Sequence, residues 1–600
     1  MIELTLNNRS NIIIPIYLGD SARIPQIKRI NEIDCFSYTV NTIKGNIDIS
    51  LPVEFVNEET FYDKMADLQT MVKTEDPSRL TRSFIEAMGS VFSDKLHTHI
   101  EDMSNRLIEL HKNEWDGIWI RIISNFMLVA KINNIDLIVG NPPWVKWEHL
   151  PQNYANNIKE LCINKSLFSG QYRMGAISLN ICALIANVTA TAWLKNDGIL
   201  AFLMPKTMLT QDSFEGFRNF FIGNNDRLYL QQIDNWDGCG TPFVYTTEKF
   251  QTYYYSRQYV DYTKGVPVTS LHKGQTNIKE LNSNIDFANV KDKIRIDNNF
   301  LAVQIDKRRT GYSMINKSDG YSYYNEIIGD CAYKARSGVE FTPKEVYMLK
   351  SKSTDEERLY YINQSDKTKY KVRAPKNGIR FSNDYMRPLI LGPNISEFSY
   401  KMDNDYCFFP YEKCVENDKE TIRLVDFERF DPILKKYLID NKHIVSKQSK
   451  KSKSIAIGDD FYALSKVGLY TFSNTLVAFR DNVKMCATVI HSENEKLMPI
   501  CAKHAPYISM DKTNRLISYD EAYYICGILN TSIVQKYFKA TYSNRSFSID
   551  LKIKMPLYDA NNRLHAEISK LAKQASIDYN SKIANQIELC YIKLCKSIEI

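Results

Sequence analysis

The sequence predicts an α/β protein, because apolar strands alternate with helical segments in its first half. Residues 135–139 and 199–204 are apolar runs of strand length, and residues 179–194 between them have the composition of a buried helix. A strand–helix–strand order of this kind is typical of a largely parallel sheet. After about residue 300, short strands and frequent turns rich in Tyr, Lys, Asn and Ser predict a second, mixed α+β domain.

Length and composition limit the class of protein. The chain has 600 residues, of which 44% are hydrophobic and 24% charged, and this predicts two or three globular domains. Its net charge of +7 permits a polyanionic partner without requiring one. No apolar run reaches the roughly 20 residues of a membrane span, and the first residues lack the pattern of a signal peptide. We therefore expect a cytoplasmic protein without a membrane partner, whose 12 cysteines are reduced.

The N-terminal third combines one strand with a long helical stretch. Residues 12–18 form an apolar strand that runs into Gly19-Asp20-Ser21. Residues 58–133 then carry apolar side chains at helical spacing, which predicts several helices before the strand at 135–139.

Two further segments complete the expected elements. Lys195-Asn196-Asp197-Gly198 is predicted to be a turn between the helix at 179–194 and the strand that ends at Pro205. Apolar residues recur at helical spacing from 560 to 600, which predicts a terminal helical hairpin.

The strand at 135–139 ends in the most distinctive motif of the chain, Asn141-Pro142-Pro143-Trp144. Two consecutive prolines have fixed φ angles and no N–H, so this loop is stiff and cannot extend the sheet. It presents a side-chain amide oxygen from Asn141, a backbone carbonyl from Pro142 and the aromatic face of Trp144. These groups are suited to hold an extruded adenine and to accept the hydrogens of its amino group. The alternative interpretation is a structural turn before a helix.

This tetrapeptide resembles motif IV of the DNA amino-methyltransferases, and its asparagine resembles the N6-adenine branch. Other matches follow in the family's order: residues 17–21 resemble the end of the motif III strand, and residues 178–205 resemble motifs V and VI. The chain thus resembles the gamma-type N6-adenine DNA methyltransferases. The resemblance implies a partial Rossmann-like methyltransferase domain at residues 1–300, with S-adenosyl-L-methionine as cofactor.

The second half resembles the target-recognition region of type IIG-like and BREX-like restriction–modification enzymes. The matching segments are short but ordered: residues 334–339, 386–395, 409–411, 521–524 and 527–531. The resemblance implies a target-recognition, DNA-binding domain at residues 301–560, followed by a C-terminal helical segment at 561–600. It also implies double-stranded DNA as a partner.

One part of the family's pattern is missing. Motifs I and II, which bind the cofactor, precede motif III in this family, but only about ten residues precede the motif III strand here. The glycine-rich segment at residues 237–241 follows motif IV and is more typical of a tight turn than of a cofactor loop. The resemblance therefore implies that a partner polypeptide supplies motif I, or that the gene is truncated.

The resemblance also assigns roles to single residues. It implies that the catalytic residues are Asn141, Pro142, Pro143 and Trp144, and that Trp144 stacks on one face of the flipped base. Phe243 is a candidate for the opposite face, as in motif VIII, and a core aromatic is an equal alternative.

Asp20 lies at a predicted strand end. There it is a candidate cofactor-binding residue, and the competing interpretation is a helix N-cap, where Asp is favoured.

Basic residues of the second half are candidates for contacts with DNA. Clusters can neutralise phosphates, although charge runs are usually solvated faces. Arginines near the family-like segments can read guanine in the major groove. The candidates are Lys307, Arg308, Arg309, Arg336, Arg387, Lys450, Lys451 and Arg545. No converging set of metal ligands is recognisable, so no metal site is expected.

The sequence thus predicts the catalytic and recognition part of a site-specific DNA adenine-N6 methyltransferase of a restriction–modification or phage-defence system. The alternative is a non-catalytic DNA-binding specificity subunit with a vestigial methyltransferase fold. A fused nuclease has less support, because the sequence has no convincing Asp…Glu-x-Lys strand pair.

Overall fold

The structure is a computed structural model, and it describes most of the chain. The described residues are 16–17, 19–42, 45–113, 119–168, 179–223, 226–240, 248–274, 293–319, 322–351, 359–362, 370–445, 458, 460–542 and 549–598. Contacts divide the chain into two compact units, Met1–Ala302 and Val303–Ile600. Each unit is described by itself.

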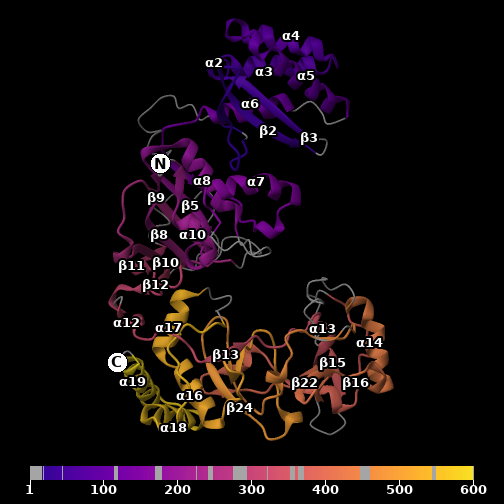
Figure 1. The fold of residues 1–600 in the computed structure, drawn as a ribbon, viewed down its shortest axis with the longest axis vertical. Helices are drawn as coiled ribbons and strands as arrows, with labels where there is room; N and C mark the ends of the chain where they lie inside the picture. Colours follow the sequence, from indigo (N-terminus) through magenta and orange to yellow (C-terminus); the bar gives the residue numbers. More distant parts are fainter. Residues whose placement is uncertain are drawn as a thin grey trace. The chain divides into compact units, whose positions relative to one another are not determined.

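The first unit begins with a small antiparallel sheet covered by helices. The strands β1 (Gln26–Ile30), β2 (Ile33–Thr42) and β3 (Gly45–Pro52) form a meander. Figure 1 shows α3, α4 and α5 gathered on one side of β2 and β3. The helices are α2 (Val53–Asn57), α3 (Phe61–Val72), α4 (Pro77–Met88), α5 (His97–Lys112) and α6 (Trp119–Ala130).

The helices of this lobe confirm the helical spacing predicted for residues 58–133. Apolar residues at that spacing are buried in one shared core, for example Phe61, Phe84 and Leu107. The start of α4 is fixed locally, because the Asp76 side chain accepts hydrogen bonds from two backbone N–H groups of the first turn.

The main sheet of the first unit contains the predicted strand–helix–strand unit. Within the first unit its order is β11–β10–β8–β9–β5–β4, in which β4 pairs only with β5 among the described residues. β4 and β5 are parallel and are connected through α7 and α8. The bounds are β4 (Ile135–Gly140), α7 (Gln152–Asn164), α8 (Ile181–Trp193), β5 (Leu194–Pro205), β8 (Tyr229–Gly238), β9 (Phe250–Ser256), β10 (Val266–Lys273) and β11 (Ile294–Val303).

Short elements lie between β5 and β8. They are α9 (Thr207–Thr210), α10 (Glu215–Arg218), β6 (Phe221–Gly223) and β7 (Asp226–Arg227). The strand predicted at residues 12–18 lies largely outside the described residues.

The prediction of a turn at residues 195–198 is wrong. These residues belong to β5, which begins at Leu194 directly after α8. The register shifts there, because Ile135 pairs with Leu194 but Leu137 pairs with Ile199. The extra residues form an irregularity within the strand, and the Lys195 ammonium bridges two carboxylates, those of Asp136 and Asp197. Turn-forming sequence is thus accommodated as a bulge at the start of a paired strand.

The glycine-rich segment after β8 is a turn as far as the structure describes it. The Cys239 N–H donates to the carbonyl of Trp236 over 2.9 Å, and Gly240 has a φ of +80°. A residue without Cβ adopts this conformation at little cost.

The second unit is built around two sheets. One has the order β13–β26–β23–β24 and the other β16–β15–β14–β20–β17–β25. The strands are β13 (Tyr333–Arg336), β14 (Met348–Ser351), β15 (Leu359–Ile362), β16 (Ile379–Arg380), β17 (Met386–Ile390), β20 (Asp405–Phe408), β23 (Thr475–Phe479), β24 (Ala487–His491), β25 (Ile500–Cys501) and β26 (Tyr507–Asp511).

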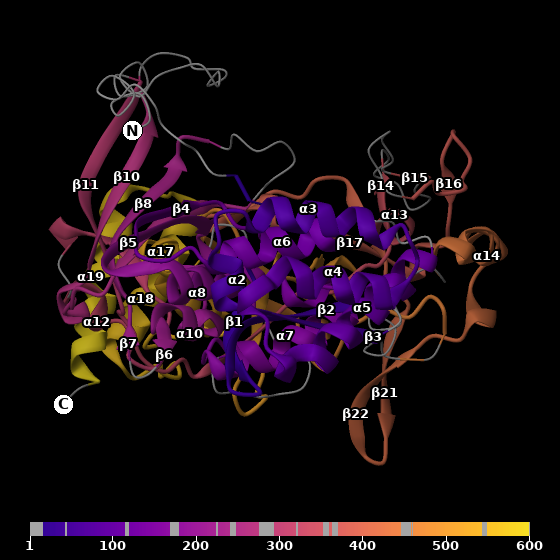
Figure 2. The same cartoon turned by 90° about the horizontal axis from the view of Figure 1, so that it is seen from above.

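Two short hairpins accompany these sheets. They are β18 (Ile395–Ser396) with β19 (Ser399–Tyr400), and β21 (Tyr411–Glu416) with β22 (Lys419–Leu424). Figure 2 shows β21 and β22 projecting as a two-stranded arm. A further strand of this unit is β12 (Ser313–Asn316).

Helices follow and flank the sheets of the second unit. The chain ends in the helical hairpin that the spacing predicted, in which α18 packs on α19 and on α16. The helices are α12 (Ser322–Asn325), α13 (Lys344–Tyr347), α14 (Pro432–Val445), α16 (Tyr519–Leu529), α17 (Ser532–Thr541), α18 (Arg563–Ile577) and α19 (Ser581–Ser597).

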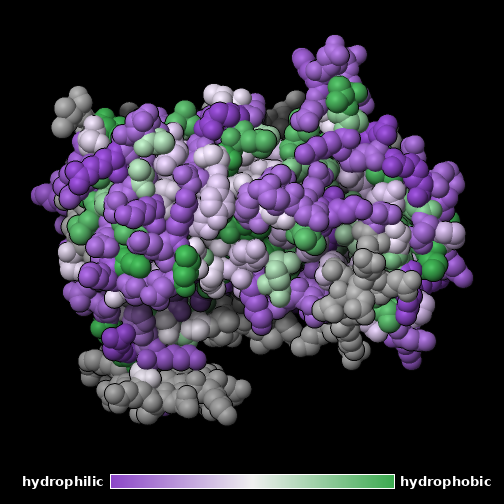
Figure 3. Space-filling view, turned by 90° about the horizontal axis from the view of Figure 1, so that it is seen from below, coloured by the Kyte–Doolittle hydropathy of each residue, from purple (hydrophilic) through white to green (hydrophobic). Residues whose placement is uncertain are grey.

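The surface is mostly polar where Figure 3 shows it, and apolar residues there are scattered singly or in small groups. Scattered apolar residues of this kind are normal for a folded domain. Among the described residues, no helix is both long and apolar enough to pass through a lipid bilayer.

Close backbone packing at Gly338 leads to a prediction for the second unit. A Cβ at this position would lie 2.1 Å from the carbonyl oxygen of Ala502, where Val339 pairs with that segment. We expect Gly338→Ala to destabilise the unit by about 3 kcal/mol, because backbone on both sides must move apart. Hydrogen exchange at residues 500–511 measures the loss.

The neighbouring substitution Ser337→Ala is the matched control. Among the described residues its hydroxyl makes only long hydrogen bonds of 3.4 Å, to the carbonyls of Gly338 and Lys503 and from Lys466 Nζ, so it should change stability by less than about 1 kcal/mol. Equal exchange rates in the two variants would contradict the packing argument.

Candidate active site at the carboxyl edge of the main sheet

Three strands of the main sheet end at one edge. β4 and β5 are parallel, and both β5 and β8 are antiparallel to β9, so β4, β5 and β8 run in the same direction. Their carboxyl ends therefore meet where β9 begins at Phe250. Ligands of open α/β sheets bind at this edge.

The loop after β4 is held at this edge by its tryptophan. Trp144 Nε1 donates a hydrogen bond to the carbonyl of Leu203 in β5 over 3.3 Å. The Trp144 ring lies 5.9 Å from the ring of Phe250, measured between centroids. The chain beyond it is anchored too, because the Ile181 N–H donates to the carbonyl of Val145 over 2.9 Å. Two prolines and these contacts make the loop rigid.

Asn141 and Pro142 leave acceptor groups unused in this rigid loop. The Asn141 side chain is exposed, and among the described residues nothing bonds to its amide. The ring of Pro142 is buried, yet no described N–H donates to its carbonyl oxygen. A stiff loop with two free acceptors is suited to bind an amino group.

An ion pair that was not predicted from the sequence lies at the same edge. Lys206 directly follows β5 and Asp237 lies near the end of β8, and Lys206 Nζ is 2.6 Å from Asp237 Oδ2. Both side chains are largely buried, and Asp237 Oδ1 has no partner among the described residues. The sequence contains a usable indication, because both residues stand at carboxyl ends of strands, where functional groups gather.

A buried polar network positions these strand ends. The Tyr253 hydroxyl donates to the carbonyl of Pro205 over 3.0 Å, and Gln251 Nε2 donates to Asn235 Oδ1 over 3.2 Å. Asn235 Nδ2 in turn donates to the hydroxyl of Ser270 over 3.1 Å. Burial raises the pKa of the Tyr253 hydroxyl well above its ordinary value, so it remains a donor.

Two other predicted site residues are not placed at this edge. Phe243 lies outside the described residues. Asp20 lies in a turn, where its carboxylate accepts from the Ala22 N–H over 2.9 Å and from the Tyr38 hydroxyl over 3.3 Å. No helix begins there, so the N-cap interpretation of Asp20 is wrong.

Comparisons with known proteins show which protein family the segment containing this site resembles. Residues 33–237 match the model of the Eco57I restriction-modification methylase family, and this segment contains the loop, β4, β5 and β8. The chain contains an Eco57I restriction-modification methylase domain. One curated relative is the modification methylase CviBIII of Paramecium bursaria Chlorella virus NC1A, 27% identical over 140 residues. The match covers 23% of this chain and 32% of the viral protein, so it spans about a third of that relative.

Solved restriction–modification enzymes are also similar to the chain. A type IIL enzyme, MmeI, in complex with DNA superposes with a TM-score of 0.41 and 10% identity, over 89% of this chain and 68% of MmeI. The type IIG restriction endonuclease BpuSI superposes with a TM-score of 0.24 and 11% identity, over 90% of this chain and 78% of BpuSI.

Outside the methylase domain, the second unit holds the predicted DNA-contacting residues in unequal settings. Lys307 is exposed. Arg308 is engaged with Asp306 and Asp330, and the ring of Tyr542 lies 4.8 Å from the guanidinium of Arg309. The remaining candidates Lys450, Lys451 and Arg545 lie outside the described residues.

Arg336 and Arg387 differ most in their settings. Arg336 is half-buried, and its guanidinium lies 4.8 Å from the centre of the Tyr470 ring. Arg387 is only 9% exposed and donates to the carbonyl of Glu495 over 2.6 Å. Burial lowers the pKa of its guanidinium, and this position favours a structural role. In the part of the chain that the structure describes, no group of three or more His, Cys, Asp or Glu is placed to hold a metal ion.

Proposed function

We propose that this chain is the catalytic and target-recognition part of a DNA adenine-N6 methyltransferase of a restriction–modification or phage-defence system. It transfers a methyl group from S-adenosyl-L-methionine to an adenine turned out of the duplex. The observation that carries the proposal is the rigid loop at the end of β4, in which Asn141 and Pro142 keep free acceptors beside Trp144.

The proposed chemistry follows from the electronic structure of adenine. Its exocyclic amine is a poor nucleophile, because the nitrogen lone pair is delocalised into the ring. Asn141 Oδ1 and the Pro142 carbonyl accept the two amino hydrogens, which draws the nitrogen toward sp³ geometry and frees the lone pair. Positioning and preorganised dipoles then lower the barrier without a covalent intermediate.

Trp144 stabilises the base outside the duplex in this proposal. Turning a base out of the stack costs a few kcal/mol. Stacking on an aromatic side chain stabilises the turned-out base by about 1–3 kcal/mol. The Phe250 ring and the Leu203 carbonyl hold the indole in place, so its orientation is set before the base arrives. Phe243 remains our candidate for the opposite face.

The described residues do not make a complete cofactor pocket. Doubly wound sheets bind their cofactor between strand 1, which carries a glycine-rich loop, and strand 4. β4 ends the sheet among the described residues, and no described glycine-rich strand–loop–helix unit lies beside it. Asp20 stays a proposed cofactor-binding residue. We assign no further step to the cofactor.

A partner polypeptide is proposed to complete this pocket. Strands of parallel sheets are normally buried on both faces. In contrast, Leu137, Val139 and Ile199 are 36%, 70% and 44% exposed, and Leu137 and Ile199 are paired in register. An unpaired strand edge beside exposed apolar side chains is suited to receive another strand and its helix.

Recognition of double-stranded DNA is proposed for the second unit. Lys307 is exposed and suited to phosphate contacts. Arg309 lies over the Tyr542 ring and Arg336 over the Tyr470 ring, and we keep both as candidates for a base or phosphate contact. Lys450, Lys451 and Arg545 remain candidates for the same surface.

The product of the reaction tests the proposed function. DNA is incubated with S-adenosyl-L-methionine and the purified chain, alone and together with proteins of its own cell extract. Mass spectrometry of the digested nucleosides should detect N6-methyladenine in the supplemented reaction and little or none with the chain alone. Detection of a methylated cytosine would overturn the assignment of adenine as the target base. Full activity of the purified chain would overturn the proposed requirement for a partner polypeptide.

A further inference from the structure

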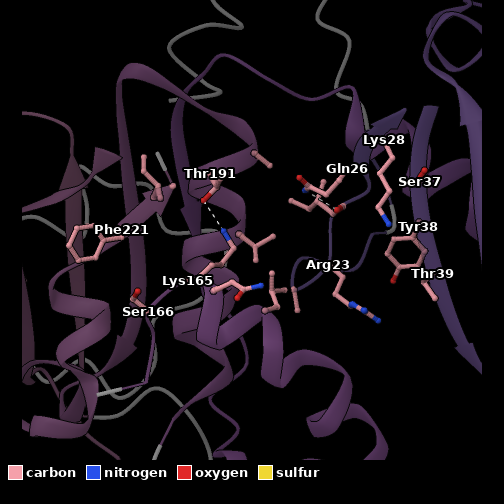
Figure 4. A pocket seen from close by; sticks show the side chains of 18 residues that line it. Arg23, Gln26, Lys28, Ser37, Tyr38, Thr39, Lys165, Ser166, Thr191 and Phe221 are labelled. Carbon is pink, nitrogen blue, oxygen red and sulfur yellow. Dashed lines mark hydrogen bonds between the residues drawn. The ribbon is translucent and has the colours of Figure 1, made fainter. Parts of the chain in front are cut away.

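A second cavity of the first unit is separate from the edge where Asn141 lies. It has a volume of about 780 Å³ and lies between residues 22–39 on one side and the carboxyl ends of α7 and α8 with β6 on the other. Figure 4 shows Lys165 and Thr191 on one wall and Arg23, Lys28 and Tyr38 on the other. Thr191 precedes the first residue of β5, whereas Trp144 contacts the last part of that strand. The two sites therefore lie at opposite ends of β5.

The charge of this cavity is one-sided. Its lining contains Arg23, Lys28 and Lys165, and no Asp or Glu among the described residues that line it. None of the three cations forms an ion pair with a described residue. Among the residues that the structure describes, Lys165 Nζ donates only to the hydroxyl of Thr191, over 3.2 Å. Burial lowers the pKa of the Lys165 ammonium, so its charged form would be stabilised by a bound anion.

Two described carboxylates bond to lining residues of the cavity, and among the described residues neither forms an ion pair with these cations. Asp48 accepts from the Thr39 hydroxyl over 2.6 Å. Asp20 precedes the lining residue Ala22, and its two oxygens accept from the Ala22 N–H and the Tyr38 hydroxyl. Its charge therefore faces groups of its own turn and of β2. Three like charges around one cavity repel one another unless an anion enters between them.

The neutral part of the lining suits a ligand larger than a single ion. The Ser166 hydroxyl lies in the lining beside the cations, and Val188 and Phe221 supply apolar surface. The lining hydroxyls of Ser37 and Thr191 are engaged within the protein, Ser37 with Ser50 and Thr191 with the Asn187 carbonyl. A volume of 780 Å³ lies within the range of small-molecule sites. Lysine, arginine and hydroxyl donors are the groups that bind phosphate oxygens.

We propose that this cavity binds the phosphate of a nucleotide. Lys165, Arg23 and Lys28 hold the phosphate oxygens, and Phe221 and Val188 contact the apolar part of the ligand. The same chemistry is offered by a free nucleotide and by a nucleotide within a DNA strand. The cavity does not involve Asn141 or Trp144, since it lies at the other end of β5.

Binding measurements on the full chain test this proposal. Calorimetric titration with ATP, with tripolyphosphate and with a short DNA duplex compares the unaltered chain with Lys165→Gln and Arg23→Gln. Each variant should weaken binding of its phosphate ligand by about tenfold to a hundredfold, the usual effect of one charge-assisted hydrogen bond. The control Lys159→Gln removes the same charge from an exposed position of α7 outside the cavity and should leave affinity unchanged.

The pattern of losses identifies the source of the phosphate. Loss of ATP and tripolyphosphate binding indicates a free nucleotide, and loss of duplex affinity alone indicates a DNA strand. The proposal is overturned if no probe binds, or if Lys159→Gln weakens binding as much as the two cavity variants. If Lys165→Gln does not fold, Asn164→Asp is the second variant, because it places a carboxylate in the lining without removing the lysine. Unchanged phosphate affinity of Asn164→Asp would also overturn the proposal.

Discussion

Replacing Asn141 with alanine is expected to lower the rate of adenine methylation by about a hundredfold to a thousandfold. The substitution removes an amide oxygen that a rigid loop holds ready for the amino group, and neither Pro142 nor Trp144 can replace it. Because the exposed side chain bonds to nothing among the described residues, the fold should be unaffected. Single-turnover formation of N6-methyladenine, with the complete set of proteins present, measures the effect.

Asn153→Ala is the matched control for this experiment. Asn153 is an exposed asparagine of α7, and its removal should change the rate less than about twofold, as for most surface substitutions. If Asn141→Ala methylates as fast as this control, the catalytic assignment fails. The chain would then be the alternative, a DNA-binding specificity subunit with a vestigial methyltransferase fold.

Replacing Glu521 with alanine should destabilise the second unit by about 2–4 kcal/mol. Glu521 is 1% exposed at the start of α16. Its carboxylate accepts from Arg515 over 2.7 Å and 3.0 Å, from the Tyr333 hydroxyl over 2.8 Å and from the Ser518 N–H over 3.1 Å. These bonds join α16 to β13, so the substitution leaves several donors without an acceptor. Arg515 is half-exposed and regains water, which keeps the loss below that of a fully buried pair.

Urea unfolding followed by hydrogen exchange in α16 and β13 measures this loss. Asp520→Ala is the control, because Asp520 is the neighbouring acid of α16 and forms an exposed pair with Lys573. An exposed pair contributes less than about 1 kcal/mol. Equal stability of the two variants would show that the bonds of Glu521 do not join the helix to the sheet.

The extent of prediction from sequence is clearest for β4 and its loop. The apolar run predicted a strand at 135–139, and the structure places β4 at Ile135–Gly140. α8 and the strand up to Pro205 follow as expected. The turn predicted at 195–198 is instead part of β5, because the propensity of Asn, Asp and Gly for turns is local, whereas pairing with β4 includes these residues in the strand.

The other members of the site depend on the order of the strands. Phe250, Lys206 and Asp237 are distant in sequence from Asn141, and they reach the same edge because β9 lies antiparallel between β5 and β8. Likewise, only packing distinguishes the buried Arg387 from the exposed Lys307. Composition and charge are the same for a basic residue in either setting.

The sequence by itself determined the strand, the stiffness of the Asn141–Trp144 loop and the chemical groups that it carries, because φ restriction and the absence of an N–H are properties of proline alone. The tertiary structure decided that the acceptors of this loop stay free, that Trp144 is held against Phe250, and that the Lys206–Asp237 pair lies at the same edge. It also decided that β4 is the last strand of the sheet among the described residues, and that its Val139 side chain is exposed. These outcomes depend on which strands become neighbours, and strand neighbours are set by long-range pairing and burial.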